Sequence, residues 1–116
     1  MKVIIAGDRN FTDYDFVKEK LDYYLSDKTK SFIIISGNAR GVDSLGERYA
    51  RENNLPLEVY PADWDKYGKS AGMIRNRQMA DVADGLIAFP SFSSIGTKGM
   101  INEAKKRGLS IRIVNI

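Results

Sequence analysis

The residues of this chain that are best suited to chemistry are arginines, hydroxyl side chains and glycines in two loops. One loop runs from Ser36 to Asp43 and the other from Ser91 to Thr97, and each lies between an apolar run and a helical pattern. Glycines let the backbone approach a ligand, and the free N–H groups of a helix start bind anions. The spacing fits neither the Walker A loop nor the G-x-G-x-x-G fingerprint. Two such loops together indicate a phosphate-bearing ligand such as a nucleotide.

Each loop also has a plainer structural interpretation. Gly37 and Gly41 could only shape a tight turn, and Ser94 or Thr97 could only cap the helix that follows. Arg40 favours the binding interpretation, because a guanidinium group matches the oxygens of a phosphate.

A third group of candidates lies in a helical stretch. Arg75 and Met79 are four residues apart, so they share a helix face, and we expect Met79 to point inward and Arg75 to lie along the sheet edge. Arg77 points in another direction and is expected to be solvated. We therefore expect Arg9, Arg40 and Arg75 to pair with the charge of the ligand.

Two aromatic residues lie in polar loops. Trp64 stands between Asp63 and Asp65, and Phe11 lies in the first loop of the chain. Either ring could stack on a base or act as a hydrophobic plug over the sheet edge, and the sequence does not separate these interpretations. Asp43 or Asp63 could accept a hydrogen bond from a ribose or an amine.

Composition narrows the chemistry further. The chain has 116 residues and contains neither Cys nor His. This excludes disulfides, thiolate zinc sites and every mechanism that needs an imidazole. No apolar run approaches the ~20 residues of a membrane span, and no signal-peptide pattern is present. We expect a cytoplasmic protein with a single domain over residues 1–116, no metal site, no membrane partner and no certain cofactor beyond the nucleotide ligand.

Apolar runs alternate with helical patterns along the chain. The expected strands are Val3–Ala6, Phe32–Ile35, Leu57–Tyr60, Leu86–Phe89 and Ser110–Val114, and the expected helices are Asp13–Leu25, Val42–Asn53, Ala71–Val82 and Thr97–Arg107, with a long polar loop from Pro61 to Gly72. Strands that are apolar throughout are typical of a parallel sheet buried on both faces. We expect an α/β fold, a Rossmann-like three-layer α/β/α sandwich whose five-stranded, mainly parallel sheet has the order 3-2-1-4-5. The functional loops then open at one edge of the sheet, with the switch point between the first and fourth strands.

The ends of three helices also carry signals. Thr12 or Asp13 is expected to cap the first helix. Ser44 and Glu47 have the spacing of a capping box in the second helix. Gly108 is expected to end the last helix, since glycine adopts the left-handed conformation found there.

The loops resemble those of the SLOG superfamily of Rossmann-like domains, most closely its YspA-related branch of bacteria and phages. The resemblance covers nearly the whole chain and rests on Gly7-Asp8-Arg9-Asn10-Phe11, Ser36 to Asp43, Pro61-Ala62-Asp63-Trp64, Tyr67-Gly68-Lys69, Ala71-Gly72, Arg75-Asn76, Met79, Ala88-Phe89-Pro90 and Ser94-Ile95-Gly96-Thr97. It implies a nucleotide or nucleotide-derived ligand in a sensor or sequestering role. The expected ligand-binding residues are Gly7, Arg9, Phe11, Ser36, Gly37, Ala39, Arg40, Gly41, Asp43, Asp63, Trp64, Arg75, Asn76, Pro90, Ser94, Gly96 and Thr97.

The resemblance also implies an enzymatic alternative. The LOG phosphoribohydrolases, which cleave the N-glycosidic bond of nucleoside monophosphates, resemble this chain at Gly96-Thr97. They have a catalytic Glu three residues after the Thr, where this chain has Met100. The nearest matches here to their catalytic residues are Arg75 and Glu103. The loss of that Glu favours binding over catalysis.

A second alternative is a single-stranded nucleic-acid binder. The DNA-processing protein DprA resembles this chain through the loop from Ser36 to Asp43. The net charge of +3 is modest for such a protein, and no basic stripe is apparent, so a nucleic-acid partner is not expected. LOG-like and DprA-like relatives often self-associate, and we therefore expect a homodimer or a higher homo-oligomer.

Overall fold

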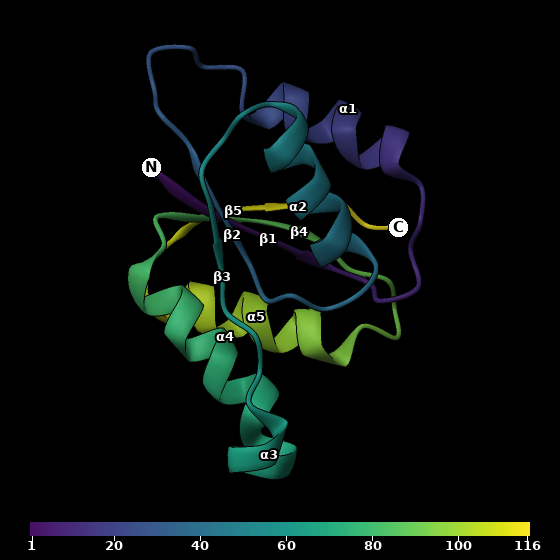
Figure 1. Cartoon of the computed structure of the whole chain (residues 1–116), viewed down its shortest axis with the longest axis vertical. Coiled ribbons are helices and arrows are strands. Elements are labelled where there is room, and N and C mark those ends of the chain that lie inside the picture. The colour runs from purple at the N-terminus through teal and green to yellow at the C-terminus, as the bar shows by residue number, and fades with distance from the viewer.

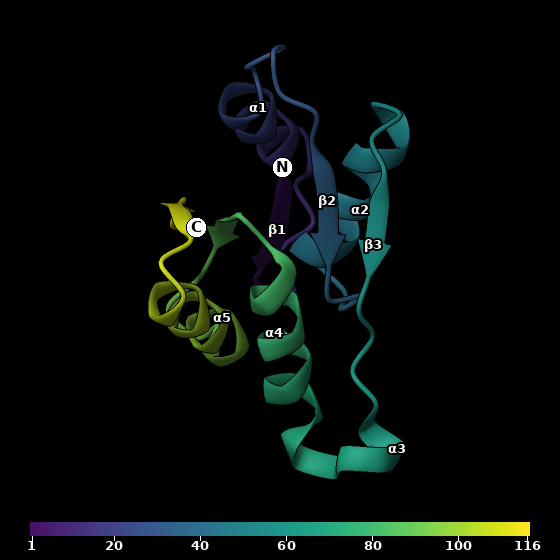
Figure 2. The same ribbon diagram turned by 90° about the vertical axis from the view of Figure 1, so that its left-hand side faces the viewer.

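A five-stranded sheet forms the centre of the computed structural model, which describes all 116 residues (Figures 1 and 2). The strands are β1 (Lys2–Gly7), β2 (Ile33–Ser36), β3 (Leu57–Val59), β4 (Gly85–Phe89) and β5 (Ser110–Ile113). They lie in the order β3-β2-β1-β4-β5, and every neighbouring pair is parallel. The predicted Rossmann-like fold and its strand order are therefore confirmed.

Helices cover both faces of this sheet. One face carries α1 (Tyr14–Tyr24) and α2 (Val42–Glu52), and the other carries α4 (Ala71–Val82) and α5 (Ile95–Lys106) (Figure 1). A short helix, α3 (Trp64–Tyr67), and a 3-10 turn (Gly68–Ser70) connect β3 to α4. Figure 2 shows α3 projecting beyond the end of the sheet. The loops that follow the strands open at that same end.

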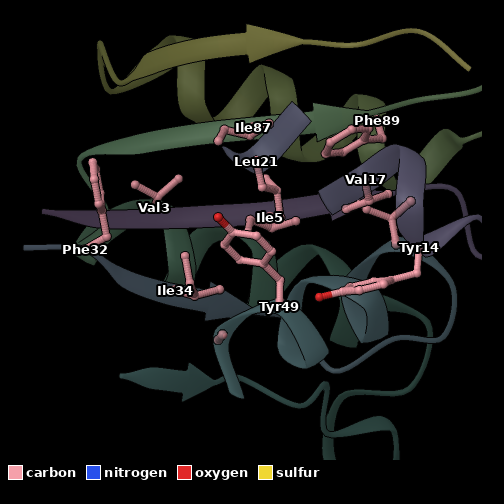
Figure 3. Close-up of a cluster of buried hydrophobic side chains, with 12 residues drawn as sticks. Val3, Ile5, Tyr14, Val17, Leu21, Phe32, Ile34, Tyr49, Ile87 and Phe89 are labelled. Carbon is pink, nitrogen blue, oxygen red and sulfur yellow. The ribbon is translucent and has the colours of Figure 1, made fainter. Parts of the chain in front are cut away.

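The core consists of two apolar layers separated by the sheet. The first layer packs β1, β2 and β4 against α1 and α2, and Figure 3 labels its members Val3, Ile5, Tyr14, Val17, Leu21, Phe32, Ile34, Tyr49, Ile87 and Phe89. The second layer packs the opposite face against α4 and α5, with Ile4, Ala6, Ile35, Met79, Leu86, Ala88 and Met100 among its members. Because alternate residues of a strand point to opposite faces, β1 contributes to both layers. Its continuous apolar run is explained by this double burial.

Two of the three helix ends that the sequence predicted are confirmed. The Asp13 carboxylate accepts a hydrogen bond from the Phe16 N–H at 3.1 Å, and Gly108, which follows the C-cap residue Arg107 of α5, has a φ of 68°. The capping box was wrong, because α2 begins two residues before Ser44, after Gly41 at the N-cap. Glu47 instead accepts a hydrogen bond from the Ser36 hydroxyl at 2.6 Å, which ties α2 to the end of β2.

The long polar loop predicted from Pro61 to Gly72 was wrong over its central part. Asp63 accepts a hydrogen bond from the Lys66 N–H at 3.1 Å and so starts α3. This helix and the 3-10 turn are too short to show a hydrophobic period, and no residue of either is buried. The capping residue Asp63 was therefore the only sign of α3 in the sequence.

The remaining differences in element bounds are of one or two residues, as at α5, which starts at Ile95 rather than at Thr97. None of the helices combines the length and the hydropathy that crossing a bilayer requires.

Candidate functional site

A cavity of about 360 Å³ opens at the carboxyl ends of β1 and β4. The strand order reverses at this point, which makes it the switch point at which open parallel sheets bind ligands. The loops after β1, β2 and β4 form its walls together with α4 and the start of α5. The lining residues are Ala6, Gly7, Asp8, Arg9, Asn10, Ala39, Arg40, Asp43, Arg75, Asn76, Met79, Ser93, Ser94, Ile95, Gly96, Thr97 and Met100.

The first turn of α5 presents unused backbone donors to this cavity. Ser94 occupies the N-cap position, but its hydroxyl makes no cap hydrogen bond. It lies instead 3.2 Å from the Asp8 carboxylate and accepts a hydrogen bond from the Ser91 N–H at 3.0 Å. The N–H groups of Gly96 and Thr97 therefore have no hydrogen-bond partner within the protein. Free N–H groups at a helix start attract an anion, both as donors and through the helix dipole.

The start of α2 has one of its backbone donors already in use. The Val42 N–H donates to the Asp8 carbonyl at 3.1 Å. Gly41 makes this contact possible, because its φ is 74° and a Cβ atom there would lie 2.2 Å from the same carbonyl oxygen. The Asp43 carboxylate also occupies the first turn and accepts a weak hydrogen bond from the Ala39 N–H at 3.4 Å. At this helix start one backbone donor is occupied and a carboxylate lies beside it, whereas the exposed guanidinium of Arg40 is available to an anion.

Arg75 is fixed above the end of β2 by its neighbours. Its Nη1 donates to the Gly37 carbonyl at 2.5 Å, and its Nε donates to the Asn76 side-chain oxygen at 3.1 Å. The Asn76 amide donates in turn to the Gly96 carbonyl at 3.3 Å and links α4 to the start of α5. A Cβ atom on Gly37 would lie 2.8 Å from Nη1, so a side chain at this position would displace the guanidinium. Arg75 lies along the sheet edge, as its spacing from Met79 predicted.

Two opposite charges line this cavity, the buried carboxylate of Asp43 and the half-buried guanidinium of Arg75. Burial raises the pKa of Asp43 to about 6, although the Arg75 guanidinium lowers it in part. Burial likewise lowers the pKa of Arg75, an effect that Asp43 opposes and Arg9 reinforces. Asp8 behaves in the opposite way, because hydrogen bonds from the Ser91 hydroxyl and the Asn10 N–H hold its pKa below the usual value. The cavity thus combines three arginines with one ionised carboxylate and one carboxylate that is easily protonated.

The structure gathers ten of the predicted ligand-binding residues around this cavity. They are Gly7, Arg9, Ala39, Arg40, Asp43, Arg75, Asn76, Ser94, Gly96 and Thr97. Gly37 and Trp64 line a second hollow beside it, which also contains Arg9, Arg40 and Arg75. Both loops singled out in the sequence therefore contribute side chains to one site.

Five other predicted residues have structural contacts that explain them. The Phe11 ring packs edge-on against Phe16 at 5.7 Å between centroids, as a hydrophobic plug would. Asp63 caps α3, and the Ser36 hydroxyl donates to Glu47. Gly41 shapes the turn before α2, and the Pro90 carbonyl accepts a hydrogen bond from the C-terminal Ile116 N–H at 3.1 Å.

Glu103 lies away from the cavity. Its carboxylate accepts a hydrogen bond from Arg107 at 2.6 Å and lies 3.6 Å from both Arg77 and Lys106. Hydrogen bonding from Arg107 holds the pKa of Glu103 below the usual value, although the side chain is almost fully buried. Met100, one turn earlier on α5, occupies the cavity floor instead. The predicted catalytic carboxylate is therefore part of an ion-pair cluster that joins α4 to α5.

Sequence reasoning missed several lining residues, of which Asp8 is the most important. Asp8 stands beside Arg9 in a loop that the sequence had already singled out, and this adjacency was the available signal. Its hydrogen bonds to Ser91 and Ser94 join loops more than eighty residues apart in the sequence. No local pattern reveals such a pairing. Met79 and Met100 were missed as lining residues because their apolar side chains are equally typical of a buried core.

Comparison with known proteins gives the same fold. DNA processing protein A (DprA) from Streptococcus pneumoniae superposes with a TM-score of 0.76 at 20% identity, over 97% of this chain and 49% of that protein, so the chain spans about half of its length. A protein designated TM1055 superposes with a TM-score of 0.68 at 18% identity, over 95% of this chain and 71% of that protein. At these identities the likeness shows the fold alone.

Sequence comparison gives the family. The Gene 61 protein of Mycobacterium phage D29 is 34% identical over an alignment of 116 positions that covers 95% of this chain and 93% of the phage protein. Residues 1–67, which carry β1 to α3, match the sequence profile of the YspA, cpYpsA-related SLOG family. The chain therefore belongs to the YspA, cpYpsA-related SLOG family.

Proposed function

We propose that the cavity at the switch point binds the phosphate of a nucleotide or nucleotide-derived small molecule. The observation that carries this proposal is the open first turn of α5, which faces the same cavity as Arg9, Arg40 and Arg75. Free backbone donors and guanidinium groups are the two kinds of anion ligand that proteins use most directly. A phosphate between them would receive hydrogen bonds from α5 and charge from the arginines.

The floor of the cavity suits the remainder of such a ligand. Ala6, Met79 and Met100 supply an apolar surface, and Asn10 and Asn76 add amide groups beside it. Small-molecule sites combine apolar walls with a few placed polar groups, and 360 Å³ lies within their usual range of about 300–1,000 Å³. A nucleoside has the matching mixture of an apolar ring face and polar edges.

Binding without turnover is the part of the proposal that the carboxylates support. Glu103 is engaged with Arg107 away from the cavity, and Met100 stands where LOG-like enzymes have their catalytic Glu. Asp8 accepts hydrogen bonds from two serine hydroxyls and so remains ionised. These features favour a sensor or sequestering role over an N-glycosidase.

The proposal is tested by calorimetric titration of the purified protein with nucleoside monophosphates of the four common bases. We expect at least one to bind below millimolar concentration. Arg75→Gln should weaken that binding about tenfold or more, because it removes a charge-assisted contact to the phosphate. Arg77→Gln is the matched control: it lies two residues along the same helix, is half exposed and pairs with Glu103, so binding should change little.

Two results would contradict the proposal. One is the absence of binding at millimolar concentration across the whole series. The other is an equal loss of binding in both arginine variants, which would indicate a general effect of charge and not a phosphate contact. Unfolding curves of both variants show whether Arg75→Gln also alters the fold.

A further inference from the structure

A second hollow of about 540 Å³ adjoins the proposed phosphate site. It lies between the loop after β2 and the loop that leads to α3, and its lining residues are Arg9, Gly37, Asn38, Ala39, Arg40, Pro61, Ala62, Trp64 and Arg75. Four of these residues, Arg9, Ala39, Arg40 and Arg75, also line the first cavity. The two spaces are therefore neighbouring parts of one site, and each has the volume of a small-ligand pocket.

Three arginines stand at the junction of the two spaces. Arg9 and Arg40 are exposed and form no ion pair within the protein. Arg75 uses Nη1 and Nε for hydrogen bonds, while its Nη2 has no partner. Like charges gathered in this way repel one another: burial lowers the pKa of Arg75 most, and the nearby Arg9 lowers it further. An anionic group at the junction would relieve that repulsion from both sides.

Trp64 forms the far wall of the second hollow. It begins α3, whose start Asp63 fixes, and 51% of the Trp64 surface is exposed. It is absent from both core layers, so it does not act as a hydrophobic plug. Pro61 and Ala62 extend the apolar wall beside it, and a flat indole face next to an apolar wall is suited to stacking a planar ring.

Asn38 supplies a polar group on the opposite side of the same hollow. Its φ of 61° is unusual for a residue with a side chain, and its backbone N–H donates to the Ser36 hydroxyl at 3.0 Å. The exposed side-chain amide carries both a donor and an acceptor, as the edge of a base does. The second hollow thus has the two features that hold a base, a stacking face and a group for its edge.

We infer that the site takes a ligand of the dinucleotide class, with two planar ends joined by a pyrophosphate. One nucleoside would occupy the first cavity and the pyrophosphate would lie between α5 and the arginines. The second planar end would stack on Trp64. This inference rests on the proposed function, because it extends the same phosphate site toward α3.

The test compares two matched ligand series by calorimetry, namely the four nucleoside monophosphates and the four symmetrical dinucleoside diphosphates with a pyrophosphate bridge. In the unmodified protein we expect at least one dinucleoside diphosphate to bind at least about tenfold more tightly than its monophosphate. Trp64→Ala should weaken that ligand about fivefold or more and leave the monophosphate unchanged, because only the dinucleotide reaches the indole. Tyr67→Ala is the control, since this partly exposed ring of the same helix lines another hollow.

Fluorescence supplies a second, independent readout. Trp64 is the only tryptophan, so stacking on it should quench the emission with the dinucleotide but not with the monophosphate. Monophosphate binding that depends on Arg75, without tighter dinucleotide binding or quenching, would overturn this inference and leave the proposed function standing. Failure of both series to bind would overturn both. Equal effects of Trp64→Ala on the two series would also reject the inference.

Discussion

At the scale of single residues, the buried carboxylate of Asp43 has the largest consequence. Asp43 is only 6% exposed, and the Arg75 guanidinium, which forms no salt bridge with it, compensates its charge only in part. Burial therefore raises its pKa from 3.8 to about 6. A buried group with a shifted pKa at a cavity is typical of a functional position, where stability is given up for binding.

The raised pKa fixes the sign of a pH effect on stability. Between about pH 4 and pH 6 the folded state binds more protons at Asp43 than the unfolded state does. The free energy of unfolding therefore falls through this interval as pH rises, by about 3 kcal/mol for a shift of about two pKa units. At neutral pH the ionised Asp43 destabilises the fold, and below pH 4 this penalty is absent.

We expect Asp43→Asn to be more stable than the unmodified protein at pH 8, by about 1–3 kcal/mol, and nearly equal to it at pH 4. Asparagine keeps the shape and one acceptor for the Ala39 N–H but carries no charge. Urea unfolding of both proteins at the two pH values measures the difference. A gain of the same size at pH 4 and pH 8 would show that the charge of Asp43 is not its cause.

At the scale of elements, the close packing of α2 against β1 fixes the position of the loops that line the site. Gly46 lies in the middle of α2, and a Cβ atom there would lie 2.8 Å from Cγ2 and 3.0 Å from Cβ of Ile5. These atoms are close to the β1 backbone and have little room to move. Gly99 in α5 differs, because the nearest atom to its Cβ position, in the Asn76 side chain, is 3.8 Å away.

We expect Gly46→Ala to destabilise the protein by about 1–2 kcal/mol, because an overpacking cost of about 1–3 kcal/mol exceeds a helix-propensity gain of up to about 1 kcal/mol. Gly99→Ala is the matched control and should stabilise it by about 0.5–1 kcal/mol, since the same gain comes without a clash. Chemical denaturation measures both values. Two stabilising substitutions would show that α2 can move away from β1 at little cost.

At the scale of the whole molecule, the sequence predicts the sheet far better than it predicts the contacts across the sheet edge. The apolar runs of β1 and β4 report burial on both faces, and one strand order places the switch point between them. The two loops and Arg75 follow from that order. The sequence could not show that the Asp8 carbonyl accepts from the Val42 N–H and that the Asp8 carboxylate engages Ser94 in place of a helix cap, because this depends on pairing between distant loops.

The same limit explains two of the predicted residues that lie outside the cavity. Glu103 has the right chemical type one turn from Met100, but the tertiary position of Arg77 and the neighbouring Arg107 draw its carboxylate into an ion-pair cluster. Phe11 lies in a functional loop, yet its ring is close enough to Phe16 to join the first core layer. Residue type and loop position therefore predict that a residue belongs to a binding site only where no apolar or charged neighbour holds its side chain elsewhere.

The distribution of burial over the molecule leads to a final prediction, measured by amide hydrogen exchange. Strands β1 and β4 are buried almost throughout, whereas α3 buries no residue, so exchange should be slowest in the central strands and fast in α3. A bound nucleoside monophosphate should slow exchange at the start of α5, where the free N–H groups of Gly96 and Thr97 would acquire a partner. A dinucleoside diphosphate should additionally slow exchange in α3, because Trp64 would then be part of the complex. Equal protection of α3 by both ligands would mean that α3 responds to phosphate binding as a whole, and not through contact with a second base.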